Sequence, residues 1–254
     1  MNISEFKYEF DISWNNIMSN QAPGLSPYEI SVFLTQSQDS IVKGIYNGTL
    51  TNPFESTEEA RSYLSPLVLQ GYPVKIQHQG NFPHITNGTI LYDLNDIKDN
   101  TGETIEKPWF ITYEGVIFGQ YNKCFAGTEG IVKPITQDTY WEIHRNPFRK
   151  DNERRVLRLN FQQGDYNFAE LVTEYSIDKY FIRYIRKPKP IILYTAQNPL
   201  PEEITIDGAH SNAEAGFTGE ECCELNESLH RIILENAVKL AQQAWVMTRT
   251  QTKE

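Results

Sequence analysis

The sequence predicts an α+β fold with N-terminal helices, a central, mostly antiparallel β-sheet and a closing C-terminal helix. Apolar residues recur with the period of a helix before residue 70 and again after residue 226. Between these regions apolar and polar residues alternate, as they do in strands that are buried on one face. Because long helices do not alternate with these strands, a doubly wound parallel sheet is not expected.

The domain organisation follows the same division. We expect a helical region over residues 1–70 and an α+β region over residues 71–254, with one continuous domain as the alternative. Residues 226–247 are expected to form a helix that packs on the sheet. A hydrophobic content of 39% and an aromatic content of 12% are sufficient for a packed core, so the chain is not expected to be disordered throughout.

Three helices are expected in the first region. The apolar stripe of the first helix consists of Phe6, Phe10, Trp14 and Ile17. The second starts after Ser26, which forms a capping-box pattern with Glu29, and ends at the turn sequence Asn47–Gly48. The third is expected to start after Ser56, because Glu59 repeats the same pattern.

The middle of the chain predicts strands and loops. Strands are expected over residues 72–80, 88–94, 108–119, 154–161 and 178–193. The acidic, turn-rich residues 93–108 and the Pro- and Gly-containing residues 198–221 indicate exposed loops. Residues 135–146 predict a short helix capped by Thr136, and Asn226 is the expected cap of the last helix.

Export and membrane insertion are not expected. The first residues, MNISEFKYEF, have neither the basic nor the apolar part of a signal peptide. No apolar run approaches the roughly 18 residues that a membrane helix needs. We therefore expect a soluble protein with no membrane partner.

The sequence contains no recognisable catalytic motif. Phosphate-binding loops, dinucleotide fingerprints, serine nucleophile elbows and zinc-protease motifs are absent. Cys124, Cys222 and Cys223 have no metal-ligand spacing, and Cys124 is expected to be a small buried thiol. We expect no enzymatic activity, cofactor or metal. The enzymatic alternative is a small hydrolase with a site around Cys124 or around His78 and His84.

Basic residues gather in one part of an otherwise acidic chain. The net charge is −10, but residues 144–189 carry eleven Lys or Arg against six Asp or Glu, which leaves −15 for the rest. Such asymmetry informs about partners rather than about fold. The candidate partner-binding residues are Arg145, Arg149, Lys150, Arg154, Arg155, Arg158, Arg183, Arg186, Lys187 and Lys189.

Three interpretations of these basic residues are open. They form solvated loops with local ion pairs, for example to Asp151 and Glu153; they bind nucleic acid beside Phe148, Tyr180 and Tyr184; or they dock on an acidic protein surface. A sequence-independent DNA-binding protein is usually basic overall, and this chain is not. Arg outnumbers Lys in the first segment, which favours paired contacts with carboxylates, so docking on a neighbouring subunit is the favoured interpretation.

Several stretches together resemble a known family. They are NQAPGLSPYEISVFLTQSQDSIVKGIYNG, FESTEEARSYLSPLV, NPFRKDNERRVLRL, RYIRKPKPIIL and CELNESLHRIILENAVKLAQQA. They are similar to structural ring proteins of the head-to-tail connector, or neck and tail, of crAss-like bacteriophages. The resemblance covers most of the chain, from about residue 5 to residue 244, and carries over no functional residues.

The resemblance implies a structural role in the virion. Copies of the chain would form a ring, expected to be a dodecamer, that contacts the portal protein and other neck or tail ring proteins. The ring would join head to tail and line the channel through which genomic DNA passes without sequence-specific binding, after assembly in the cytoplasm of the host bacterium. The alternative function is a nucleic-acid-binding accessory protein that uses the Arg and Lys residues of segments 145–158 and 183–189.

Overall fold

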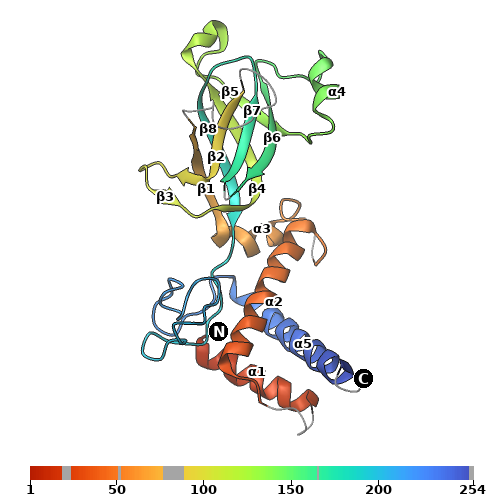
Figure 1. Ribbon diagram of the computed structural model, residues 1–254, viewed down its shortest axis with the longest axis vertical. Helices are drawn as coiled ribbons and strands as arrows, with labels where there is room; N and C mark the ends of the chain where they lie inside the picture. The colour runs from red at the N-terminus through yellow and green to blue at the C-terminus, as the bar shows by residue number, and fades with distance from the viewer. Residues whose placement is uncertain (19–23, 51–52, 77–88, 165, 252–254) are drawn as a thin grey trace. The chain divides into compact units, whose positions relative to one another are not determined.

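The computed structural model describes residues 1–18, 24–50, 53–76, 89–164 and 166–251. The chain divides into two compact units (Figure 1). The helical unit consists of Met1–Leu67 and Pro188–Glu254, and the barrel unit of Val68–Lys187. The first boundary lies close to the expected one, but the C-terminal part of the chain returns to the N-terminal helices. The helical unit is therefore discontinuous in sequence.

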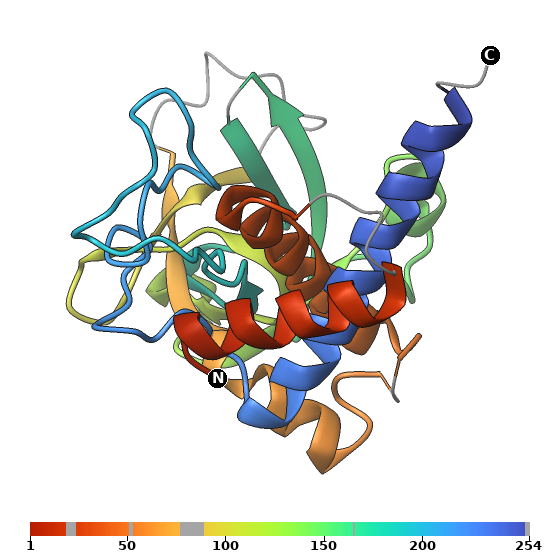
Figure 2. The same ribbon diagram turned by 90° about the horizontal axis from the view of Figure 1, so that it is seen from below.

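Three long helices form the body of the helical unit. They are α1 (Ile3–Met18), α2 (Pro27–Asn47) and α5 (Glu227–Gln251). After α2 come the short helix α3 (Glu58–Leu64) and the 3-10 helix η1 (Ser65–Leu67). α5 packs against α2 and α1 (Figure 2). The sequence predicted the sheet as the partner of this helix, and the contacts found are with α1 and α2 of its own unit. Its apolar stripe, with Leu229, Ile233 and Ala237 buried, fits a helix surface as well as a sheet, so the stripe does not identify its partner.

The ends of α2 and α3 are determined by local hydrogen bonds. The capping box at α2 is confirmed: the Ser26 backbone N–H donates to the Glu29 carboxylate at 2.8 Å, and the Glu29 N–H donates to Ser26 Oγ at 3.3 Å. At α3 the expected cap is wrong by one residue, because Thr57 Oγ1 accepts from the Ala60 N–H at 3.2 Å. Ser56 and Thr57 both carry a hydroxyl, and the capping pattern does not distinguish neighbouring hydroxyls.

Polar side chains of α2 bind the chain that follows the barrel unit. The Leu193 N–H donates to Ser31 Oγ at 3.0 Å, and the Ile191 N–H donates to Thr35 Oγ1 at 3.1 Å. Gln38 Nε2 donates to the Lys189 carbonyl at 2.8 Å. These bonds satisfy buried backbone groups that have no strand neighbour. They explain why the strand expected to reach residue 193 ends earlier.

The described residues of the barrel unit form eight strands. They are β1 (Val68–Lys75), β2 (Ile90–Lys98), β3 (Thr104–Ile105), β4 (Pro108–Phe118), β5 (Glu129–Pro134), β6 (Arg155–Gln163), β7 (Tyr166–Val172) and β8 (Ile177–Arg186). Their order is β1-β8-β4-β5-β6-β7-β2-β3, and pairing of β1 with β2 closes the sheet into a barrel. Only β5 and β6 pair in parallel among the described strands. The expected α+β fold with a mostly antiparallel sheet is confirmed.

Some strands differ from the expectation. Residues 93–98 continue β2 and residues 104–105 form β3, although residues 93–108 were expected to be a loop. Leu94 and Ile97 face the core, and the polar residues Asn95 and Asp96 between them obscure that pattern in the sequence. Strands β5 and β7 were not expected. The long antiparallel pair of β4 with β8 matches two expected strands.

The interior of the barrel is mainly apolar but contains one ion pair. Its buried residues include Leu94, Val116, Val132, Val156, Leu171, Tyr92, Tyr180 and Ile182. Glu114 on β4 and Arg158 on β6 are both buried there, with Arg158 Nε 2.9 Å from Glu114 Oε2. The barrel unit therefore has a polar centre as well as an apolar core.

Candidate functional site

The connection between the parallel strands β5 and β6 contains a short helix, α4 (Tyr140–Arg145). We call residues 136–155 the α4 segment. Tyr140 is buried against Leu157, Leu159 and Val172 on the outer face of the barrel. Thr136 was expected to cap this helix, but Thr139 occupies the capping position, and the hydroxyls of these two residues lie 2.9 Å apart. The segment is thus anchored by one face of its helix.

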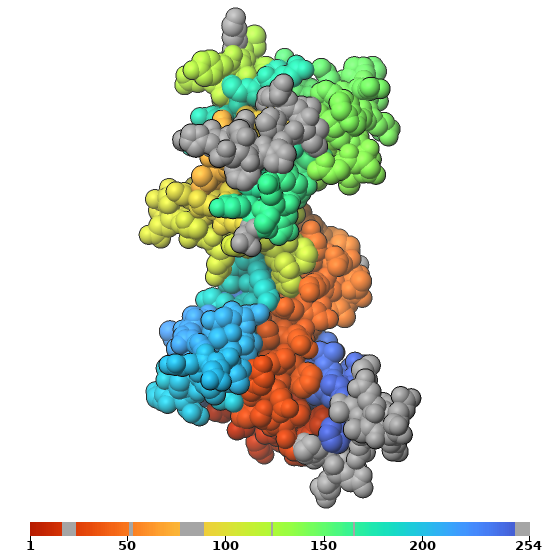
Figure 3. All heavy atoms as spheres, viewed as in Figure 1, coloured from red at the N-terminus to blue at the C-terminus, as the bar shows by residue number. Residues whose placement is uncertain are grey.

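The opposite face of the α4 segment exposes aromatic and basic side chains. Trp141 is 58% exposed and Phe148 is 88% exposed. The guanidinium of Arg145 lies 5.8 Å from the centre of the Trp141 ring, and Arg149 Nη1 lies 3.9 Å from a carboxylate oxygen of Glu142. The segment, drawn in green, stands out from the rest of the barrel unit in Figure 3. Exposed aromatic residues beside arginines are typical of protein interfaces.

The ten candidate basic residues do not form one surface. Arg145, Arg149, Arg154, Arg183 and Lys187 are exposed; Lys150, Arg155 and Lys189 are partly buried; Arg158 and Arg186 are buried. Several of the buried and partly buried residues make hydrogen bonds or ion pairs within their own unit. The structure therefore separates surface residues from residues that hold the fold.

Three of the less exposed members bind atoms of the same unit. Arg155 Nη2 donates to the carbonyls of Phe148 and Lys150, at 2.8 Å in both cases, and so fixes the return of the α4 segment. Arg186 Nε lies 2.8 Å from Glu106 Oε2. Lys189 Nζ lies 5.6 Å from the centre of the Phe217 ring. Replacement of these residues would disturb the fold as well as any docking surface.

Arg158 belongs to a buried polar cluster in the barrel interior. Its Nη1 donates to Asn160 Oδ1 at 2.7 Å, and Tyr180 donates its hydroxyl hydrogen to Glu114 at 3.0 Å. The Nε–H of Arg158 is not aligned on the nearby carboxylate, so that contact is an ion pair without a good hydrogen bond. Burial raises the pKa of Glu114, and the charge of Arg158 and the Tyr180 hydrogen bond offset this only in part.

A second charged region lies in the helical unit. Residues 190–230 contain eight Asp or Glu and no Lys or Arg. We call residues 198–227 the acidic loop. Its exposed carboxylates are those of Glu202, Glu203, Asp207, Glu214, Glu220, Glu221 and Glu227. Sequence reasoning treated this region only as an exposed loop, although the uninterrupted run without a basic residue was a visible signal.

The acidic loop has a defined shape although it contains no helix or strand before α5 begins at Glu227. Ile206 and Ala209 are buried in an apolar cluster with Ile192 and Leu200. Asn212 Nδ2 donates to the carbonyl of Gly219 at 2.7 Å, which ties two parts of the loop together. The loop forms a compact lobe, coloured cyan to blue in Figure 3. Its carboxylates are therefore presented on a folded surface.

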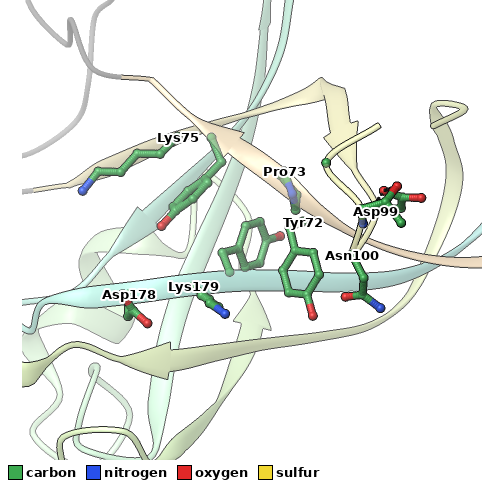
Figure 4. Close-up of a pocket in the computed structure, with 11 residues that line it drawn as sticks. Tyr72, Pro73, Lys75, Asp99, Asn100, Asp178 and Lys179 are labelled. Atoms are coloured by element: carbon green, nitrogen blue, oxygen red, sulfur yellow. Dashed lines mark hydrogen bonds between the residues drawn. The ribbon is translucent and has the colours of Figure 1, made fainter. Parts of the chain in front are cut away.

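A hollow of about 510 Å³ opens in the barrel unit (Figure 4). Tyr72, Asp99, Asn100, Asp178 and Lys179 are among the residues that line it, from β1, β8 and the turn between β2 and β3. Hydrogen bonds, the strongest from the Thr101 hydroxyl, lower the pKa of Asp99. This carboxylate therefore already accepts hydrogen bonds from residues of its own turn. Among the described residues that line it there is no cysteine, serine or histidine. This composition gives no support for a catalytic site.

The three cysteines differ in exposure. Cys124 is exposed, so the expectation of a buried thiol is wrong. Burial raises the pKa of both Cys222 and Cys223 to about 12, which keeps them protonated and unreactive near neutral pH. His78 and His84 lie outside the described residues.

The described residues add two further findings. No group of three His, Cys, Asp or Glu among them has the arrangement of a metal site. In the same part of the chain, no helix is both long enough and apolar enough to cross a membrane.

Comparison with known proteins identifies the family. The phage tail ring protein 3/4 family matches residues 1–253, which include both units. The chain belongs to this family. It is 34% identical over 256 residues to Ring protein 3 of Bacteroides phage crAss001, covering 99% of this chain and 97% of that protein. It is 30% identical over 253 residues to Ring protein 4/5 of the same phage, covering 96% of this chain and 94% of that protein.

Membership in the ring protein family bears out the resemblance to crAss-like phage ring proteins. Both relatives match nearly end to end, so the α4 segment and the acidic loop lie within the matched region. The two charged surfaces thus belong to a phage tail ring protein, and neither is an appended extension.

Proposed function

We propose that this chain is a structural subunit of a ring in the portal–tail connector, or neck, of a tailed phage virion. The ring joins the head to the tail and lines the channel for the genome. Its partners are further copies of the chain, the portal protein and other neck or tail ring proteins. The proposed stoichiometry is a dodecamer, and assembly takes place in the cytoplasm of the host bacterium.

The single observation that carries this proposal is the match of the ring protein family over residues 1–253. The surface charges support it. A heterologous contact between different surfaces of identical subunits produces a closed ring when the rotation closes. The chain has an exposed basic and aromatic surface in one unit and an exposed acidic surface in the other.

The acidity of the chain also agrees with a channel-lining role. A net charge of −10 repels the phosphates of DNA, so the genome would pass without being held. A structural rather than a catalytic role agrees with the unreactive thiols at residues 222–223 and with the composition of the hollow in the barrel unit.

Electron microscopy of intact particles tests this proposal. Symmetry-resolved averaging of the neck should show a closed ring of this chain next to the portal, with twelve copies. A ring with another copy number would correct the stoichiometry only. Absence of the chain from purified particles would overturn the connector function.

Nucleic-acid binding is the second candidate function. The exposed Trp141 and Phe148 beside Arg145 and Arg149 favour it, since bases stack on aromatic side chains in basic grooves. It predicts binding of single-stranded DNA that weakens steeply as salt rises. The purified chain should show no such binding at physiological salt if the exposed arginines serve protein contacts.

A further inference from the structure

The α4 segment has the features of an inserted docking element. Its base is fixed because Tyr140 is buried in the apolar cluster on β6 and β7, and because Arg155 binds two carbonyls of the returning chain. Its outer face exposes Trp141 and Phe148. A rigid base reduces the conformational entropy that is lost on binding, so exposed aromatic residues on it are suited to be binding anchors.

The charges of the α4 segment indicate the chemistry of its partner. Arg145, Arg149 and Arg154 are exposed, and only Arg149 has an ion pair among the described residues, a long one of 3.9 Å. Guanidinium groups pair with carboxylates in a planar, two-bond geometry and also stack on aromatic rings. The matching surface is therefore one that is rich in carboxylates and contains some apolar area.

Two acidic surfaces of the chain can be compared as partners. At the turn between β2 and β3, Lys98 ends β2 and Lys107 follows β3, so lysines flank the acids. The Asp99 carboxylate accepts the N–H groups of Thr101 and Glu103. The region of this turn carries charges of both signs, and its Asp99 carboxylate already accepts hydrogen bonds within the turn. It is the weaker candidate.

The acidic loop is the stronger candidate. It contains no Lys or Arg, it is folded around its own apolar cluster, and Ile204 beside Glu202 and Glu203 is 39% exposed. Exposed carboxylates around an exposed aliphatic side chain complement arginines around aromatic rings.

We propose that the α4 segment of one copy docks on the acidic loop of the neighbouring copy, and that this contact joins subunits within the ring. This inference rests on the proposed function, because it requires that copies of the chain associate. The contact joins two different surfaces, so each copy uses its α4 segment on one side and its acidic loop on the other. Such a contact is directional and repeats around a ring.

A charge-exchange experiment tests this pairing. The basic variant carries Glu202→Arg, Glu203→Arg and Glu220→Arg, and the acidic variant carries Arg145→Glu, Arg149→Glu and Arg154→Glu. Arg155 and Glu214 are left unchanged, because Arg155 binds carbonyls and the Glu214 carboxylate accepts the His210 N–H at 2.7 Å. The matched control carries charge reversals at three exposed lysines of the barrel unit: Lys107→Glu, Lys133→Glu and Lys179→Glu.

The variants are supplied from plasmids to host cells infected by phage that lacks its own copy of the chain. The amount of the chain in purified particles is then measured. Each variant alone should be incorporated about tenfold less than the unmodified chain, because like charges meet at every contact. The two variants supplied together should restore incorporation, since an alternating ring places opposite charges at every contact. The control variant should be incorporated normally, and melting curves of the purified variants should match that of the unmodified chain.

The possible outcomes separate the inference from the proposed function. If the unmodified chain is absent from particles, the proposed function itself is wrong. If the unmodified chain is present and both variants are incorporated normally, the pairing is wrong. If the variants are excluded but the mixture does not restore incorporation, the α4 segment binds another partner, such as DNA or the portal protein, and the inference is overturned.

Discussion

Replacing Arg158 by methionine should destabilise the barrel unit much more than replacing Arg158 and Glu114 together by methionine and leucine. The two side chains are 8% and 6% exposed, and Arg158 Nε lies 2.9 Å from Glu114 Oε2. Arg158→Met alone leaves a buried carboxylate whose remaining bond comes from the Tyr180 hydroxyl. Loss of one partner of a buried ion pair costs about 3–5 kcal/mol.

The double replacement removes both charges and keeps most of the volume. The attraction between the charges is about 6 kcal/mol for an effective dielectric constant of about 20 at this distance. Desolvation of two ions costs several kcal/mol each, so the attraction does not exceed the cost of burying the pair. The raised pKa of Glu114 agrees with this balance, because burial outweighs the charge of Arg158. We expect the double variant to lie within about 1 kcal/mol of the unmodified protein, or to be more stable.

Amide hydrogen exchange followed by mass spectrometry is the suitable assay. A chain with two units need not unfold in one step, so a single midpoint would mix the two. Exchange protection of peptides from β4, β6 and β8 reports the opening free energy of the barrel unit alone. If the double variant is destabilised as much as Arg158→Met, the ion pair stabilises the fold and the reasoning is refuted.

Three other predictions follow from local features. Glu114→Gln should remove a part of the stability that declines as pH rises above the usual pKa of glutamate, because the native state holds the Glu114 proton more tightly than the unfolded state does. Opening free energies should be measured by hydrogen exchange between pH 4.5 and 8. Over this range those of the unmodified protein should fall relative to those of the variant. A relative rise would contradict the burial argument. A thiol reagent at pH 8 should label Cys124 rapidly and the native pair at residues 222–223 slowly, because that pair has a pKa of about 12; equal labelling would contradict it. Ser26→Ala should cost the helical unit about 1 kcal/mol in exchange protection of α2, whereas Ser56→Ala should cost less, and equal losses would argue against the capping assignment.

The helices were predictable because their signals are local. The stripe from Phe6 to Ile17 and the capping box at Ser26 lie within a few turns of the chain, and the structure has α1 and α2 there. The partner of α5 was not predictable, since its stripe fits either a sheet or a helix. The sheet order was not predictable either. Pairing of β1 with β8 and of β2 with β7 joins segments far apart in sequence, and no local pattern encodes that choice.

The candidate site was predicted in part. The basic composition identified the α4 segment, but it did not separate exposed Arg154 from buried Arg158. Both faces of β6 are covered, one by the barrel core and one by the α4 segment, so the alternation that reveals orientation is lost there. Trp141 was missed, although Trp141 and Arg145 lie one helical turn apart and share a face.

The order in which the chain is synthesised differs from the order in which the helical unit can be completed. α1 and α2 leave the ribosome first, but Ser31 and Thr35 can accept the N–H groups of Leu193 and Ile191 only when those residues arrive. Ser37 Oγ donates to the carbonyl of Ile233 in α5 at 2.7 Å. Synthesis of the whole barrel unit, Val68–Lys187, comes in between. During that interval the apolar stripes of α1 and α2 lack the surface of α5. The helical unit is thus expected to finish folding only after the barrel unit, which makes nascent chains stalled before residue 227 prone to aggregate.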